Sequence, residues 1–146
     1  MSHVYPLNGE FSERSELGNK GANLVAMTGL GLPVPPGFVV PIKAYERWRE
    51  TGALPDEAIG EAMASLEVEM GRRLGQGLEV SVRSSAPVSM PGMMDTILNI
   101  GDAAHVRSAV KRIFESWDNP RAVEYRRLNG IPPTLGTAAV VQAMVY

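Results

Sequence analysis

Residues 78–100 read LEVSVRSSAPVSMPGMMDTILNI, and this stretch does most to determine the class of fold. From Leu78 to Arg83 apolar and polar residues alternate strictly, with leucine and valines on one face and Glu79, Ser81 and Arg83 on the other. A period of two predicts a strand. Serines, prolines and a glycine interrupt the pattern over 84–94, and 96–100 is predicted to be a returning strand that ends at Gly101.

Helical patterns lie on both sides of these two strands. A first helix is predicted to open near Asn19 and to stop at Gly29, and a second to cover 43–50. A third is predicted after Pro55, with Arg72 and Arg73 in its last turn and Gly75 at its end. Two more are predicted after Asp102 and after Asp118 or Asn119, and apolar strands at 38–40 and 138–145. Strands that alternate with helices predict an α/β or α+β fold.

Composition narrows the possible functions. The chain has 146 residues, the usual size of one domain, so a single domain over 1–146 is expected. Its 14 basic and 16 acidic residues nearly balance, which argues against nucleic-acid or anionic-membrane binding. It has no cysteine and only two histidines, which disfavours disulfides, thiolate metal sites and multi-histidine centres. No apolar run approaches a membrane span and no secretory signal is visible, so a cytoplasmic protein is expected.

Three features suggest phosphate chemistry, and each has an ordinary structural alternative. Arg83 ends a strand before a loop of serines and glycine, and its guanidinium fork suits phosphate oxygens, although surface arginines are common at strand ends. Lys20 lies in the first turn of a helix, where a cation is unfavourable because it opposes the helix macrodipole. A bound anion would remove this penalty; the ordinary alternative is a solvated lysine.

The third feature is the loop SMPGMMDT at residues 89–96. Three methionines around Pro91-Gly92 would expose apolar surface in a solvated hairpin, whereas a glycine could let backbone N–H groups approach an anion. Alternatively, the methionines pack back on the sheet around a tight turn. The loop matches neither the Walker pattern nor the dinucleotide fingerprint.

The order of several motifs resembles the pyruvate, phosphate dikinase family. The motifs are LGNKGANL at 17–24, GLPVPPGF at 31–38, VSVRSSA at 80–86, SMPGMMDTILN at 89–99, WDNPRA at 117–122 and VQAMV at 141–145. They cover nearly the whole chain, and the run from Met90 to Thr96 favours the dikinase over the related phosphoenolpyruvate synthase.

The resemblance implies a phosphotransferase (a kinase). It implies the ATP-binding portion of an enzyme that converts ATP, phosphate and pyruvate to AMP, diphosphate and phosphoenolpyruvate, with Mg²⁺ accompanying ATP. The implied fold is an ATP-grasp-type N-terminal subdomain, a mixed sheet flanked by helices that is incomplete relative to the full family domain. Carried over by position, the implied ATP phosphate contacts are Lys20, Arg83, Ser89, Gly92, Met93, Asp95 and Thr96.

Departures from the family pattern set further expectations. The family's second half, with metal ligands and adenine contacts, has no counterpart before Tyr146, and the connections at 43–77 and 101–116 are compact. Neither His3 nor His105 lies in a phospho-acceptor motif. Without an acceptor histidine or pyruvate site the isolated chain is expected to be inactive, and the metal ligands stay unknown. Asp95 could help to hold magnesium or could brace the loop.

The remaining expectations concern partners. The missing C-terminal half would carry the phosphohistidine and pyruvate domains, and an apolar final strand could leave an edge that pairs with another copy, giving a homo-oligomer. Arg121, Arg126 and Arg127 form a basic helix face, which is ordinarily only solvated. The alternative function is a stand-alone, non-catalytic binding or interaction module that retains part of the fold.

Overall fold

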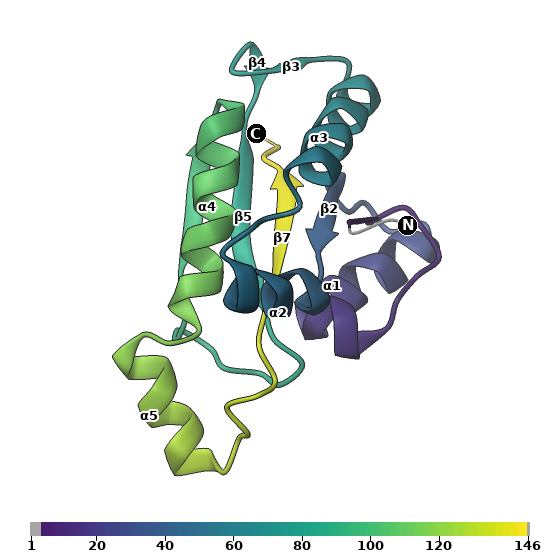
Figure 1. Cartoon of the computed structure of the whole chain (residues 1–146). Coiled ribbons are helices and arrows are strands. Elements are labelled where there is room, and N and C mark those ends of the chain that lie inside the picture. The colour runs from purple at the N-terminus through teal and green to yellow at the C-terminus, as the bar shows by residue number, and fades with distance from the viewer. Residues whose placement is uncertain (1–3, 146) are drawn as a thin grey trace.

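In the computed structural model the chain folds into a five-stranded sheet with helices on both faces (Figure 1). The structure describes residues 4–145. The elements in chain order are β1 (Tyr5–Pro6), α1 (Arg14–Gly29), β2 (Gly37–Val40), α2 (Ile42–Thr51), α3 (Asp56–Met70), β3 (Arg73–Leu74), β4 (Gly77–Leu78), β5 (Val80–Ser85), β6 (Thr96–Ile100), α4 (Ala103–Ser116), α5 (Pro120–Asn129) and β7 (Ala138–Ala143). The α+β class predicted from the alternation of strands and helices is confirmed.

The strand order is β1-β2-β7-β5-β6, and every pairing in this sheet is antiparallel. The prediction of a mixed sheet is therefore wrong for the main sheet; β3 and β4 form a separate two-residue parallel pair. The reason is that β7 inserts between β2 and β5 and runs opposite to both. The same insertion makes β7 a central strand, so the predicted free edge at the last strand is also wrong.

Each face of the sheet has its own apolar core. Val80 and Val82 of β5 pack with α2, α3 and α4, which lie on the near side of the strands in Figure 1. Val39 and Val140 face the other way and pack with Leu17, Leu24 and other residues of α1. Because both faces are covered, Ser81, which the alternation assigned to a polar face, is buried.

Glycines and caps set the helix ends. α3 ends at Met70 because Gly71 adopts a left-handed φ of 67°, so the predicted end at Gly75 was wrong and Arg72 and Arg73 lie beyond the helix. The backbone N–H of His105 donates to Asp102 Oδ1 over 2.8 Å, which confirms that cap. His105 is exposed in the first turn of α4, whereas His3 lies outside the described residues.

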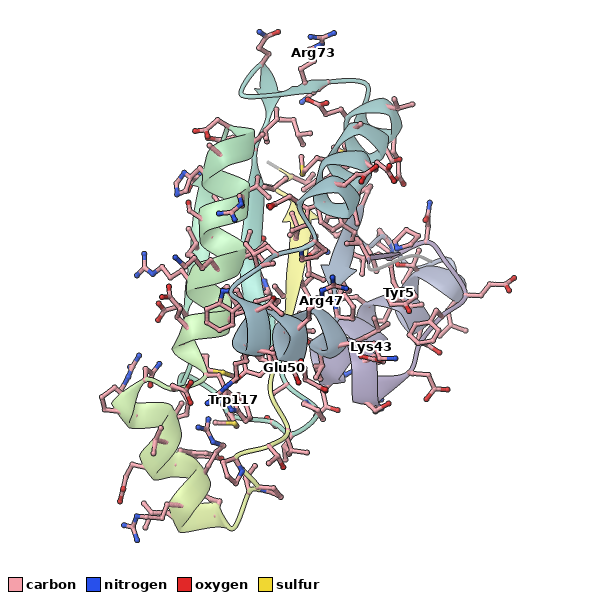
Figure 2. The ribbon with its side chains drawn as sticks, viewed as in Figure 1. Tyr5, Lys43, Arg47, Glu50, Arg73 and Trp117 are labelled. Carbon is pink, nitrogen blue, oxygen red and sulfur yellow. The ribbon has the colours of Figure 1, made fainter. Side chains whose placement is uncertain are left out.

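A cluster around Trp117 attaches α5, which projects from the lower end of the sheet in Figure 1. Trp117 lies where α4 meets α5, as Figure 2 shows, and is fully buried. The Arg126 guanidinium stacks on its ring at 3.9 Å, and Nη1 donates to the Trp117 carbonyl oxygen over 2.7 Å. Arg126 is therefore buried and does not belong to the basic surface predicted with Arg121 and Arg127.

Among residues 4–145 no helix is both long and apolar enough to cross a membrane.

Candidate phosphate-binding site

The Ser85 side chain joins the end of β5 to the start of α1. Its hydroxyl donates to the Leu17 carbonyl oxygen over 2.7 Å and accepts from the Gly21 N–H over 2.9 Å. Beside it, the Asn19 N–H donates to the Ala86 carbonyl oxygen over 2.8 Å. Ser85 is buried, so these bonds are shielded from water. We call this set of three hydrogen bonds the Ser85 clamp.

Gly18 allows the clamp to close. Its φ of 71° and ψ of 176° interrupt the helical conformation, so the regular part of α1 opens at Asn19, as predicted, whereas the helical stretch that begins at Arg14 was not predicted. A Cβ built on Gly18 would overlap the backbone of Ser85. Only glycine combines this backbone conformation with so close an approach of two chain segments.

The clamp brings Lys20 next to the end of β5. Lys20 lies between Asn19 and Gly21, both of which donate to the 85–86 segment. Its side chain is exposed and makes no ion pair with any residue in the described part of the chain. The neighbouring carboxylate of Glu16 is paired with Lys43 instead, at 3.9 Å.

The prediction that Arg83 ends its strand is wrong, because β5 continues to Ser85, two residues further on. Because side chains alternate along a strand, both side chains leave β5 on the face covered by α1, about 7 Å apart along the strand. Arg83 is half-buried, and its Nε is a buried donor without a hydrogen-bond acceptor in residues 4–145. A buried guanidinium donor without an acceptor is unusual and is expected where an anion binds.

Thr96 is the direct partner of Arg83 across the β5–β6 pair. Directly opposed residues share a face, so the exposed Thr96 side chain lies on the Arg83 side of the sheet. The structure therefore brings three of the predicted contacts, Lys20, Arg83 and Thr96, to one end of the sheet.

The loop between the strands contains a tight turn over Met90–Met93, which we call the methionine turn. The Met93 N–H donates to the Met90 carbonyl oxygen over 3.2 Å, and Gly92 has a φ of 74°. Proline followed by a left-handed glycine is typical of a type II turn. Met90 is buried and Met93 packs against the core, whereas Ser89 and Gly92 are exposed. The methionine side chains therefore pack back on the protein, as in the structural alternative given for this loop. The backbone at the exposed residues Ser89 and Gly92 is accessible to a ligand.

The Asp95 side chain lies away from Lys20 and Arg83. Its Oδ2 accepts from Arg112 Nε of α4 over 3.0 Å, and α4 lies on the opposite face of the sheet from α1. This ion pair braces the loop. Within residues 4–145 no group of three or more histidine and acidic residues is arranged to hold a metal ion.

Sequence reasoning assigned no role to Ser85 or Arg14. Arg14 donates to the Asn19 and Asn23 side-chain oxygens over 2.9 and 2.8 Å, which holds its guanidinium against the first turns of the regular part of α1. Ser85 lies in the motif at 80–86, and Arg14 lies shortly before the motif at 17–24. Their roles depend on side-chain contacts in the folded chain, which a local sequence pattern does not show.

Residues 50–146 match the family model described as the AMP/ATP-binding domain of pyruvate phosphate dikinase. The chain therefore belongs to this family. The matched range includes Arg83 and the methionine turn and excludes Lys20.

Individual relatives are pyruvate, phosphate dikinases. The enzyme of Rhizobium meliloti (strain 1021) is 30% identical over 233 residues, covering 94% of this chain and 26% of the relative. That of Clostridium symbiosum is 31% identical over 234 residues, covering 94% and 27%. Pyruvate, phosphate dikinase 2 of Zea mays is 48% identical over 224 residues, covering 89% and 25%. The chain thus spans about a quarter of the length of these relatives.

Proposed function

We propose that this chain supplies the phosphate-binding part of an ATP site in a pyruvate, phosphate dikinase-like phosphotransferase of ATP-grasp type. The observation that carries the proposal is the Ser85 clamp, which joins the Lys20 helix start to the strand that bears Arg83. The family match and the dikinase relatives support the same conclusion.

The proposed chemistry follows from the charges. Lys20 contributes a compact ammonium at a helix N-terminus, and Arg83 contributes a planar fork of donors that can bind two phosphate oxygens. Phosphoryl transfer depends mainly on positioning and on neutralising charge at the transferring group. In this proposal the exposed Thr96 hydroxyl and the backbone at Ser89 and Gly92 complete the contacts, whereas the Met93 N–H is already bonded to the Met90 carbonyl oxygen, so Met93 shapes the turn instead of touching phosphate.

We further propose that the acceptor histidine and the pyruvate site lie in other parts of the enzyme. His105 is exposed on α4, on the face opposite to Arg83. The pure chain should therefore not convert ATP, phosphate and pyruvate to phosphoenolpyruvate. A coupled assay in which it turned over would refute this.

Magnesium enters the proposal only with ATP. Asp95, which the sequence left as a possible magnesium ligand or a brace for the loop, is paired with Arg112 of α4, and this supports the bracing role. Mg²⁺ would instead be held through the phosphates of the nucleotide. No step of the proposed binding depends on it.

Calorimetry at low salt tests the proposal with ATP, inorganic triphosphate and AMP. Because the contacts are to phosphates, ATP and triphosphate should bind alike and AMP hardly at all. Binding should weaken as salt rises, since partly exposed charges are screened within about 10 Å at 0.1 M ionic strength. Equal binding of AMP and ATP would contradict the proposal, and no binding of any of the three would favour the non-catalytic module.

A further inference from the structure

Asn119 makes two hydrogen bonds that join α5 to the methionine turn. Its Oδ1 accepts from the Ala122 N–H over 2.8 Å and so caps α5. Its Nδ2 donates to the Met93 carbonyl oxygen over 2.8 Å. The cap dictates which way the amide faces, because only the oxygen can accept from a backbone N–H. The NH₂ group is therefore directed to Met93.

The residue that makes these bonds is itself held firmly. The Asn119 N–H donates to the Ser116 carbonyl oxygen over 3.1 Å. Its neighbour Asp118 pairs with Arg49 of α2 at 3.0 Å, and Trp117 Nε1 donates to the Pro133 carbonyl oxygen over 3.1 Å. Contacts from α2 and from the segment before β7 thus fix the junction between α4 and α5.

The methionine turn depends on few anchors. Met90 is held by burial, the Met93 side chain by packing against the core and Asp95 by Arg112, while Asn119 is the group that holds the Met93 backbone carbonyl. The exposed residues Pro91 and Gly92 lie between the Met90 and Met93 anchors. A type II turn without a fixed far side would exchange among backbone conformations, since glycine adds many accessible states.

We propose that Asn119 is a positioning residue that holds the methionine turn in its ligand-ready conformation for the polyphosphate of a nucleoside triphosphate. This inference rests on the proposed function, because it names the residue that prepares the loop of the same site. Asn119 acts through the Met93 carbonyl and does not touch the ligand. Pre-ordering a loop strengthens binding because less conformational entropy is lost when the ligand arrives.

The substitution Asn119→Asp separates the two bonds. Aspartate caps helices as well as asparagine does, so the cap and the fold should survive. A carboxylate cannot donate to the Met93 carbonyl. Asn129→Asp is the matched control, because it makes the same change in charge at the other end of α5, where the Asn129 amide donates only to the Tyr125 carbonyl oxygen over 2.8 Å. Asn119→Ser is a neutral second variant that keeps a cap but is too short to reach both partners.

Two measurements on the full chain decide the matter. Hydrogen exchange at the Met93 amide should become about tenfold faster in Asn119→Asp and Asn119→Ser than in wild type or Asn129→Asp. Inorganic triphosphate should bind about three- to tenfold more weakly to both Asn119 variants, the range that one hydrogen bond supports. Melting temperature should change little, which distinguishes positioning from loss of the fold.

The two possible failures are distinguishable. If the wild-type chain does not bind triphosphate, the proposed function fails, whatever the exchange rates. If it binds triphosphate, but the Asn119 variants match Asn129→Asp in exchange or in affinity, the positioning role fails and the proposed function stands. If Asn119→Asp does not fold, the Asn119→Ser comparison gives the same decision.

Discussion

Replacing Ser85 with alanine should open the contact between β5 and α1. The change deletes the hydroxyl that donates to the Leu17 carbonyl over 2.7 Å and accepts from the Gly21 N–H over 2.9 Å. Two buried backbone groups would lose their partners. An unsatisfied buried polar group costs about 1–3 kcal/mol, so after partial relaxation the free energy of unfolding should fall by roughly 2–4 kcal/mol.

Urea denaturation monitored by circular dichroism measures this loss. Ser84→Ala is the matched control, because Ser84 is the neighbouring half-buried serine on the opposite face of β5 and makes no side-chain hydrogen bond with the described residues. Its stability should stay within about 0.5 kcal/mol of wild type. A Ser85→Ala chain that lost no more than Ser84→Ala would refute the clamp as the link between the two segments.

Three further substitutions test the fold around the site. Gly18→Ala should lower stability by more than about 3 kcal/mol, because φ is 71° and a Cβ would overlap the β5 backbone, whereas Gly29→Ala, which meets open space, should be neutral or slightly stabilising in the same urea experiment. Arg126→Ala should cost about 2–3 kcal/mol through the lost stacking on Trp117 and the lost hydrogen bond; a thermal melt equal to wild type would contradict this. Burial raises the pKa of Tyr45, so the folded state retains the phenolic proton and stability should fall as pH rises above about 10. Tyr45→Phe should remove that fall, as alkaline denaturation would show.

Local patterns were sufficient for most elements of the fold. Rules that act within a few residues explain the Asp102 and Asn119 caps, the start of the regular part of α1 at Asn19 and the strand around Val82. The end of α3 was predicted wrongly because Gly71 and Gly75 could both end a helix. The helical spacing of apolar residues continues to Leu74, which favoured the later glycine.

Long-range features were beyond a local pattern. The insertion of β7 between β2 and β5 depends on pairing with distant strands, so neither the antiparallel sheet nor the loss of a free edge was predicted. Arg126 was assigned to a solvated face because its burial depends on the Trp117 ring. The proposed phosphate contacts were predicted from motifs, but the Ser85 clamp joins residues 64 and 68 positions apart.

The most direct test of the account is calorimetric titration of inorganic triphosphate into wild type, Lys20→Ala, Arg83→Ala, Arg83→Lys and Lys111→Ala at low salt. Lys111→Ala is the charge control, because Lys111 is an exposed lysine on α4, which covers the face of the sheet opposite to Arg83. A hydrogen bond to a charged group contributes about 1.5–3 kcal/mol, so Lys20→Ala and Arg83→Ala should each weaken binding about tenfold or more, and Lys111→Ala hardly at all. Arg83→Lys should also weaken binding if the arginine contact is bidentate. Unchanged affinity in Arg83→Ala, or an equal loss in Lys111→Ala, would contradict the claim that Lys20 and Arg83 bind one polyphosphate.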